Sequence, residues 1–309
     1  MPHKLPYHEY LKTKLSRHVE RTLKRLYPED QERRDCFLAA VIAQDARMPA
    51  IFWMDTPPEK RPFRTKQVAD WQPDWVDVLT HLNEDQPSRD PYYYDGAYYL
   101  LDFSSVCEAS ALLAITTPVK TILDVCAAPG GKGIFAWRLF HPEKLICNEV
   151  IGKRHASLAS NLERCHVPGQ IVQLDPSQLP ARYEKECDLV LVDAPCSGQS
   201  LVARGMEAPG AYQDHLVNSN MSRQRRILAE SLACVSPGGY LAYSTCTYGR
   251  EENEKNVEWL LRTFPEFKAR EVPHLQKHRS TLIEEACYRF EPQEGVGAGG
   301  FVALFLRAA

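Results

Sequence analysis

The spacing of apolar residues changes partway along the chain, and this change divides the sequence into two parts. In the part up to about residue 91, the apolar positions of the first segment recur every three or four residues, which is the period of an amphipathic helix. A first helix is predicted over 7–27, and CFLAAVIAQDA predicts a second over 36–46. Proline and tryptophan interrupt the segment 57–91, in PPEKRPF and QPDW, and this pattern is typical of loops. The apolar positions of the first helix are Tyr7, Leu11, Leu15, Val19, Leu23 and Leu26.

From about Tyr92 onward, short apolar runs alternate with helical stretches. The predicted strands are TILDVC, LICNEV, QIVQL, CDLVLVDAP and GYLAYSTC, and a closing hairpin is predicted from CYRFEP and FVALFLR. The predicted helices are IFAWRLF, KRHASLASNLERC, RQRRILAESLACV and EENEKNVEWLLRTF. This alternation predicts an α/β domain over 92–309 with a mostly parallel sheet, after a smaller, mainly helical region over 1–91.

Composition narrows the function classes only slightly. The 309 residues are 44% hydrophobic, enough for the core of one large or two modest domains. The net charge of −3 does not single out a nucleic-acid partner, although local patches matter more than the total. No apolar run approaches the ~20 residues of a membrane span, and the first residues lack an apolar export signal. We therefore expect a cytoplasmic protein with no membrane partner.

The ten cysteines are expected to be reduced thiols, as is usual for cytosolic proteins. No two of them have C-x-x-C spacing, so the sequence predicts no metal site. Most are interpreted as core residues, because free cysteine is among the most buried residue types. Cys196 and Cys246 stand apart, since each closes a predicted strand, in DAPCSG and in YSTC.

Thiols and carboxylates recur at one position relative to the predicted strands. In open α/β sheets, ligands bind outside the carboxyl ends of the strands, where the strand order reverses. We therefore expect the side chains at these ends to gather at one edge of the sheet. Core packing alone does not explain thiols and carboxylates at that edge. They are Asp124, Glu149, Asp175, Asp193, Cys196 and Cys246.

The segment DVCAAPGGKG, residues 124–133, joins the first strand of this domain to a helix. It is not a Walker loop, because Cys126 replaces the first glycine and Gly133 follows the lysine, and it lacks the G-x-G-x-x-G of dinucleotide sites. A cofactor with a nucleoside and a carboxylate, S-adenosylmethionine, fits a glycine loop at a helix N-terminus. Glu149 can then hold the ribose hydroxyls and Asp175 the adenine amino group. The alternative is a tight turn with incidental acids.

Three motifs carry a family resemblance: DVCAAPGGKG, DAPCSG and YSTCTYGREENE, in that order. Together they resemble the Sun (Fmu) family of RNA cytosine-5 methyltransferases over about residues 92–309. The resemblance implies a Rossmann-like class I methyltransferase fold with a seven-stranded, mostly parallel sheet, and S-adenosylmethionine as the cofactor. The implied cofactor contacts are Cys126, Ala127, Ala128, Pro129, Gly130, Gly131, Lys132, Glu149, Arg154, Asp175 and Asp193.

The chain also departs from the family pattern. After DAPCSG the family often continues with a glycine, an apolar pair and an arginine, whereas this chain has QSLVARG, with Arg204 in roughly that place. The first 90 residues match less clearly, which leaves the RNA target open.

Carbon 5 of cytosine is a weak nucleophile, and a thiolate that adds to carbon 6 activates it. The pattern of residues leaves open which thiol attacks. The Pro-Cys dipeptide of DNA cytosine-5 methyltransferases would nominate Cys196, whereas the resemblance to the RNA family nominates Cys246, with Cys196 assisting release of the methylated base. Asp193, three residues before Cys196, is the candidate for a hydrogen bond to ring nitrogen 3. The alternative for both cysteines is buried filler.

The expected partner is RNA, ribosomal rather than transfer RNA, bound by a monomer. A flipped target base needs a basic surface to hold the phosphates. The candidate surface is the first helix, although charged helix faces are often only solvated. Its basic residues, with two that follow, are Lys12, Lys14, Arg17, Arg21, Lys24, Arg25, Arg33 and Arg34.

Three other functions compete with this interpretation. A DNA cytosine-5 methyltransferase would need a Glu-Asn-Val motif and a target-recognition insertion, and only about fifty residues separate the two cysteines. An amino-methyltransferase would carry [DN]-P-P-[FYW] where this chain has DAPC. A catalytically idle RNA-binding or ribosome-assembly factor would not need both cysteines, Asp193 and the glycine loop.

Overall fold

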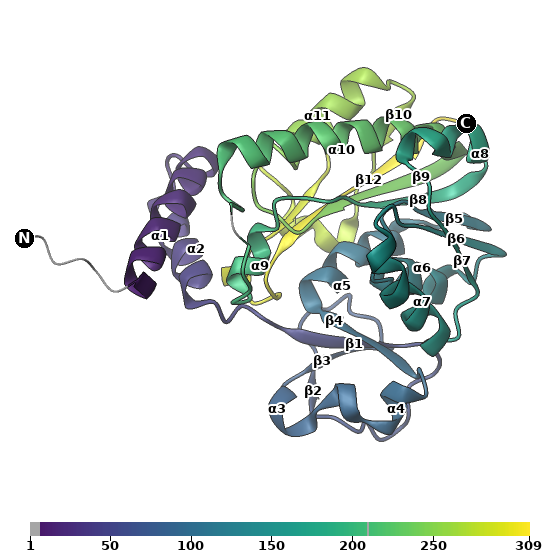
Figure 1. The fold of residues 1–309 in the computed structure, drawn as a ribbon, viewed down its shortest axis with the longest axis horizontal. Coiled ribbons are helices and arrows are strands. Elements are labelled where there is room, and N and C mark those ends of the chain that lie inside the picture. Colours follow the sequence, from purple (N-terminus) through teal and green to yellow (C-terminus); the bar gives the residue numbers. More distant parts are fainter. Residues whose placement is uncertain (1–6, 209) are drawn as a thin grey trace, which may run out of the picture.

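Two β-sheets organise the chain, with helices packed around them (Figure 1). The computed structural model describes residues 7–208 and 210–309, with side chains from Arg17 onward except those of Leu82 and Asn83. The smaller sheet is antiparallel and has the order β2-β3-β1-β4. Its strands are β1 (Pro49–Trp53), β2 (Thr65–Lys66), β3 (Val76–Leu79) and β4 (Tyr98–Asp102).

The larger sheet has the order β10-β12-β9-β8-β5-β6-β7, and β11 pairs with β12 beside this path. The neighbours from β7 to β9 run parallel, whereas β12 is antiparallel to both β9 and β10. From β5 the chain proceeds outward to β6 and β7 and then returns to β8, so the order reverses between β5 and β8. The strands are β5 (Thr121–Asp124), β6 (Lys144–Asn148), β7 (Gly169–Val172), β8 (Cys187–Asp193), β9 (Val235–Thr245), β10 (Phe267–Ala269), β11 (Tyr288–Phe290) and β12 (Gly300–Arg307).

Helices cover both faces of the larger sheet. Residues of α5, α6 and α7 join one buried cluster against it, and residues of α8, α10 and α11 join a second cluster on the opposite face. In Figure 1, α1 and α2 lie beside α9, at the end of the molecule away from β7. The helices are α1 (Tyr7–Leu26), α2 (Gln31–Ala43), α3 (Leu82–Asp85), α4 (Pro91–Tyr94), α5 (Phe103–Ser110), α6 (Gly131–Phe140), α7 (His155–Arg164), α8 (Leu179–Tyr183), α9 (Gln199–Ala203), α10 (Asp214–Cys234) and α11 (Glu254–Thr263).

The predicted fold is confirmed in its main features. The Rossmann-like α/β arrangement, the mostly parallel sheet, the helical N-terminal region and the closing hairpin of β11 and β12 are all present, and β10 adds an eighth strand to the predicted seven. Helix α2 begins five residues before the prediction, since Asp30 caps it by accepting a hydrogen bond from the Arg33 amide. Among the described residues, no helix is long and apolar enough to cross a membrane.

The two stretches interpreted as loop, PPEKRPF and QPDW, lie outside the strands and helices, whereas the smaller sheet around them was not predicted. Strands β2 and β3 lie inside the segment 57–91, and β1 directly precedes it. Every residue of β3 is buried, because one buried cluster covers one face of this sheet and a second covers the other. Strand β2 has two residues and β3 has four, and runs this short carry too little periodicity to be recognised as strands from sequence.

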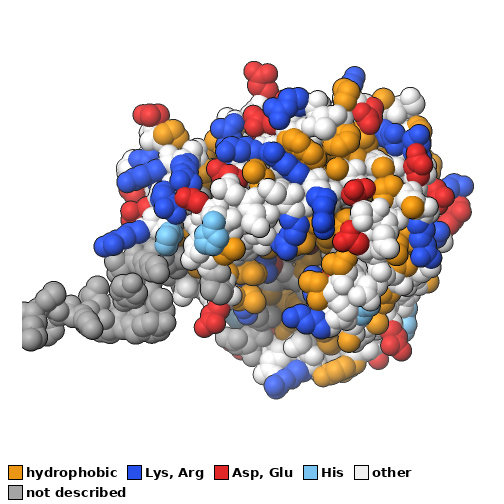
Figure 2. All heavy atoms as spheres, turned by 45° about the horizontal axis from the view of Figure 1, so that its top comes forward, with side chains coloured by type: hydrophobic (Ala, Val, Ile, Leu, Met, Phe, Trp, Pro, Cys, Tyr) orange, Lys and Arg blue, Asp and Glu red, His pale blue; other side chains and the backbone are white. Residues whose placement is uncertain are grey.

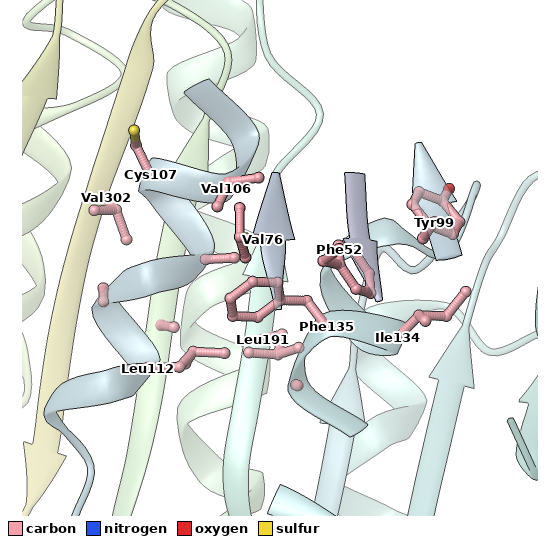
Figure 3. Packing of buried hydrophobic residues seen from close by; sticks show 14 of the residues in the cluster. Phe52, Val76, Tyr99, Val106, Cys107, Leu112, Ile134, Phe135, Leu191 and Val302 are labelled. Carbon is pink, nitrogen blue, oxygen red and sulfur yellow. The ribbon is translucent and has the colours of Figure 1, made fainter. Parts of the chain in front are cut away.

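Aromatic packing joins the smaller sheet to the larger one (Figure 3). Phe52 of β1 has no exposed surface, and its ring makes a T-shaped contact with Phe135 of α6 at a centroid distance of 5.3 Å. Tyr99 of β4 stacks on Phe52 at 5.5 Å. The division into residues 1–91 and 92–309 stays a prediction, and β4, from the second part, pairs with β1, from the first.

Replacing Phe52 tests whether the two sheets share one core. Phe52→Ala leaves a cavity between β1 and α6, and we expect it to reduce the free energy of unfolding by about 3–5 kcal/mol. The measurement is urea unfolding followed by circular dichroism. Tyr94→Ala is the control, because 66% of that side chain is exposed and its loss leaves no cavity. Equal, small effects from both substitutions would contradict a shared core.

Candidate active site

The pairing of β8 with β9 brings two distant cysteines together. The strands are parallel, with Asp193 opposite Ser244, so the segments that follow them leave the sheet side by side. Cys196 comes three residues after Asp193, and Cys246 comes two residues after Ser244. Their Sγ atoms are 3.1 Å apart, which is within hydrogen-bond distance for two thiols. The two cysteines therefore lie together at one edge of the sheet, as predicted.

Buried polar contacts hold the two cysteine-bearing segments in place. The Glu252 carboxylate accepts a hydrogen bond of 2.9 Å from the Ser197 amide and one of 2.7 Å from the Gln224 side chain. Gln224 also donates to the Pro195 carbonyl at 3.0 Å. The hydroxyls of Ser197 and Thr247 lie 2.8 Å apart and link the two segments directly. These contacts flank both cysteines, so they restrict the motion of each sulfur relative to the other.

The pKa values of the two thiols are shifted in opposite directions. The hydrogen bond from the Cys196 thiol holds the pKa of Cys246 below its usual value, against the effect of burial. That same bond raises the pKa of Cys196, and burial and the nearby charges of Cys246 and Glu252 raise it further. The pair therefore shares a single proton over a range of pH, with the negative charge on Cys246.

A buried lysine joins two carboxylates next to the thiols. Lys132 Nζ lies 2.6 Å from Glu108 Oε2 and 2.8 Å from Asp193 Oδ1. The Ser244 hydroxyl donates to the same Asp193 oxygen at 3.0 Å. Burial disfavours the Lys132 ammonium, but the two carboxylates outweigh burial and raise its pKa. Burial raises the pKa of Glu108 to about 7, although Lys132 acts in the opposite direction.

The glycine loop follows β5 and opens into a cavity. Gly130 has a φ of +114°, a conformation that other residues rarely adopt. A Cβ atom on Gly133 would lie 2.9 Å from Asp124 Oδ2, so only glycine lets α6 pack this close to the end of β5. The adjoining cavity has a volume of about 280 Å³. It is lined by Tyr99, Leu100, Leu101, Asp102, Ser105, Asp124, Cys126, Ala127, Ala128, Pro129, Gly131, Lys132, Asp193 and Arg204.

One buried oxygen at the cavity has no hydrogen-bond partner among the described residues. Asp124 Oδ1 is this atom, and burial, with the nearby charge of Asp193, raises the pKa of Asp124 to about 7. Asp124 is one of the residues that line the cavity, and buried polar atoms normally have partners, so this unpaired oxygen is consistent with a site for a ligand. Figure 2 shows a hollow on one face of the molecule, with hydrophobic side chains in its walls and both basic and acidic side chains around its border.

Two of the predicted cofactor acids lie outside the lining of this cavity. Glu149 is buried at the end of β6, where it accepts hydrogen bonds of 2.9 Å from the Ile151 amide and from Arg154. Arg154 also donates to the Ala128 carbonyl, so it ties Glu149 to the glycine loop. Asp175 is exposed, and hydrogen bonds from Ser177 lower its pKa. The two acids therefore stand at the expected strand ends, with their carboxylates already held by local contacts.

Three residues of the site could not be recognised from the sequence. Glu108 lies in α5, ahead of the glycine loop, and its ion pair with Lys132 spans 24 positions in the sequence with no diagnostic spacing. Glu252 lies inside YSTCTYGREENE but has no assigned role there. Gln224 lies in the middle of α10, where a single glutamine in a polar helix is unremarkable in sequence. Among the described residues, no group of side chains could hold a metal ion.

The predicted basic surface on α1 is partly neutralised. Arg25 pairs with Asp214 at 2.8 Å, and Arg21 lies 3.6 Å from the same carboxylate. Arg33 pairs with the buried Glu291 at 2.7 Å. Arg34 donates to the Tyr27 and Pro28 carbonyls, and the side chains of Lys12 and Lys14 lie outside the described residues. Arg17 and Lys24 are exposed.

Comparison with known proteins identifies the family. Residues 111–306 match the family model described as 16S rRNA methyltransferase RsmB/F, which is more than half of the chain. The chain belongs to this family. The predicted Sun-family resemblance is thereby confirmed.

Curated relatives of the RsmB/F family share about a third of their aligned residues with this chain. Ribosomal RNA small subunit methyltransferase F of Pectobacterium atrosepticum is 33% identical over 216 residues, which is 68% of this chain and 44% of the relative. The enzyme of that name from Pectobacterium carotovorum is 30% identical over 222 residues, or 70% and 46%. The match thus spans less than half the length of these relatives.

Solved structures related to this RsmB/F-family chain show the same fold. A methyltransferase homologue from Pyrococcus horikoshii superposes with a TM-score of 0.74 at 21% identity, covering 93% of each chain. NSun6 from Pyrococcus horikoshii, crystallised with SFG, superposes with a TM-score of 0.71 at 17% identity, covering 94% of this chain and 98% of that one. Both cover nearly the whole chain, so the likeness extends beyond residues 111–306, the part that the family model matches.

Removing the hydrogen bond between the thiols should change the reactivity of Cys246. A thiolate reacts with iodoacetamide and a thiol does not, so a higher pKa means slower alkylation at pH 7.5. In Cys196→Ala the donor is lost, the pKa of Cys246 rises, and we expect its alkylation to slow roughly three- to tenfold. The measurement is peptide mass spectrometry over time. Cys36, exposed on α2, is the internal control, and its rate should not change. Faster alkylation of Cys246 would contradict the assignment.

Proposed function

We propose that this chain transfers the methyl group of S-adenosylmethionine to carbon 5 of a cytidine in ribosomal RNA, through a covalent bond between a cysteine and carbon 6. The observation that carries this proposal is the 3.1 Å separation of the Cys196 and Cys246 sulfurs beside the ion pair of Lys132 and Asp193. Thiols that only fill a core have no need of a charged neighbour or of an adjacent cavity.

The residues around the glycine loop fit the cofactor. Gly130 supplies the positive φ before α6, Gly133 lets this helix pack against the end of β5, and Asp124 has an unpaired buried oxygen. The proposed contacts are the loop from Cys126 to Lys132, with Glu149, Arg154, Asp175 and Asp193 around it. When bound, S-adenosylmethionine supplies an electrophilic methyl group on a positively charged sulfur. The crystallisation of NSun6 with SFG, an S-adenosylmethionine analogue, supports this choice of cofactor for the fold.

Cys246 is the proposed nucleophile. Its thiolate forms a bond to carbon 6 of the cytosine, and the electron pair of the 5,6 double bond makes carbon 5 nucleophilic while ring nitrogen 3 gains a proton. Once carbon 5 carries the methyl group, a base removes the proton on carbon 5, the bond between carbon 6 and sulfur breaks as the 5,6 double bond re-forms, and ring nitrogen 3 gives back the proton that it gained. The lowered pKa of Cys246 supports this role, because more of its sulfur is ionised at neutral pH.

The neighbours of Cys246 have distinct proposed roles. Asp193 Oδ1 is held by Lys132 and Ser244, whereas Oδ2 makes no hydrogen bond with another described residue. With 39% of the Asp193 side chain exposed, Oδ2 is available to the base at ring nitrogen 3. Cys196 keeps its proton and assists release, because it can give a proton to the departing Cys246 sulfur.

Ribosomal RNA is the proposed substrate, in preference to transfer RNA. The names of both Pectobacterium relatives specify the RNA of the small ribosomal subunit. A cytosine in folded RNA must leave its stack to reach a buried thiol. We place the reaction in the cytoplasm, where this substrate is found.

Methyl transfer to unmodified ribosomal RNA tests the proposal. We expect wild-type protein with radiolabelled S-adenosylmethionine to label small-subunit RNA that lacks 5-methylcytidine, and nucleoside mass spectrometry to identify the product as 5-methylcytidine. Cys246→Ala should lower the rate at least ~10³-fold, because the covalent step is lost. Cys36→Ala should retain full activity, since that thiol is exposed on α2.

Two outcomes would contradict the proposal. A labelled nucleoside other than 5-methylcytidine would exclude carbon 5 as the acceptor. Binding of S-adenosylmethionine and RNA without any transfer would favour the RNA-binding or ribosome-assembly factor instead.

A further inference from the structure

Three depressions on the surface join into one groove that leads away from the active-site cavity. The cavity shares Leu100, Leu101, Asp102 and Arg204 with a second depression. The second depression shares Arg47 and Pro49 with a third, which has a volume of about 580 Å³. We call the second and third depressions together the flank groove. Its further lining residues are Met48, Lys66, Leu79, Thr80, His81, Glu84 and Met206.

The flank groove crosses the smaller sheet at the end where β1 begins and β4 finishes. The register places Asp102 of β4 opposite Pro49 of β1, Ala50 of β1 opposite Val78 of β3, and Val78 opposite Lys66 of β2. Adjacent strands lie about 4.8 Å apart, so the path from β4 to β2 is about 14 Å long. A stacked nucleic-acid strand rises ~3.4 Å per nucleotide, and about four nucleotides therefore fit this length.

Unpaired positive charges lie along the flank groove. Arg47 and Lys66 are exposed, and neither side chain makes a hydrogen bond or ion pair with another described residue. Arg204, between the groove and the cavity, has a buried Nε atom without a partner, and its nearest described acid is Asp102, at 3.8 Å. The cations of α1 differ, because Arg21 and Arg25 are already close to Asp214.

The acidic residues of the flank groove are already engaged. Glu84 pairs with Arg64 and lies 3.7 Å from His81. Asp102 is buried and accepts hydrogen bonds from the Ser104 amide and hydroxyl. Apolar surface is exposed as well, since 47% of Met206 is accessible. The groove thus combines free cations with apolar surface, which suits a strand with charged phosphates and flat bases.

We infer that the flank groove binds the single-stranded RNA next to the target cytidine, with Arg204, Arg47 and Lys66 holding successive phosphates. The identity of this RNA rests on the proposed function, because the groove begins at the cavity where the cytosine would enter. Continuity with that cavity and charge complementarity favour an RNA strand as the occupant. The smaller sheet, which positions Pro49, Leu79 and Lys66, then acts as part of the substrate-binding surface.

A double substitution tests this inference through salt dependence. The probe is a fluorescein-labelled, 12-nucleotide single-stranded RNA with one central cytidine, and binding is followed by fluorescence anisotropy between 50 and 200 mM NaCl. Each lost phosphate contact lowers the slope of log K against log salt by ~0.7. We expect Arg47→Gln/Lys66→Gln to reduce that slope by about 1.4 and to weaken binding on the order of tenfold at 100 mM salt. Affinity for S-adenosylmethionine, measured by calorimetry, should not change.

A matched control separates a local effect from a change in total charge. Arg262→Gln/Lys268→Gln removes one arginine and one lysine that are exposed on α11 and β10. This control should keep the wild-type slope. The inference is overturned if the control lowers the slope as much as the groove variant, if the groove variant keeps the wild-type slope, or if the wild type does not bind the probe.

The two proposals can fail separately. A wild type that binds RNA with a groove-dependent slope but transfers no methyl group would refute the proposed function and retain the groove as an RNA site. A wild type that forms 5-methylcytidine, with a slope unaffected by the groove substitutions, would retain the function and refute the groove.

Discussion

The parallel pairing of β8 with β9 is the constraint on which the site depends. It places Asp193 opposite Ser244, and the segments after these residues carry Cys196 and Cys246 to within 3.1 Å of each other. A shift of one residue in this register would turn every side chain of one strand to the other face of the sheet. The buried Glu252, which accepts hydrogen bonds from Ser197 and from the α10 helix, then fixes one of these segments against its surroundings.

Electrostatics determine which member of this thiol pair is reactive. Lys132 is a buried cation in contact with Glu108 and Asp193, so it offsets carboxylate charge that acts to raise the pKa of Cys246. Replacing a single partner in such a buried network is costly, because it leaves a charge without compensation. Asp193 and Lys132 of this network also line the cavity. The ion pairs of Lys132 therefore affect both the ionisation of the thiols and the space into which a substrate would enter.

Much of this arrangement could be predicted from the sequence, and the reasons are local. Each strand of the α/β domain is a short apolar run, so the sequence predicts β5 and β8. The chain itself then puts Asp193 at the end of β8 and Cys246 directly after β9. The smaller sheet cannot be recognised in the sequence because β2 has two residues and β3 four, which is too short for a periodic pattern. Glu108 was missed because its partner is defined only by tertiary packing, and the choice between Cys196 and Cys246 required a family resemblance.

A covalent trap tests the central claim that Cys246 attacks and Cys196 releases. Cys196→Ala and Cys246→Ala proteins are each mixed with S-adenosylmethionine and small-subunit RNA that lacks 5-methylcytidine, and denaturing gels are examined for a protein–RNA band. The account predicts a band with Cys196→Ala, because the bond to carbon 6 forms but the base is not released, and no band with Cys246→Ala. A band with Cys246→Ala alone would reverse the two roles. Absence of both bands, with an active wild type, would contradict the covalent mechanism.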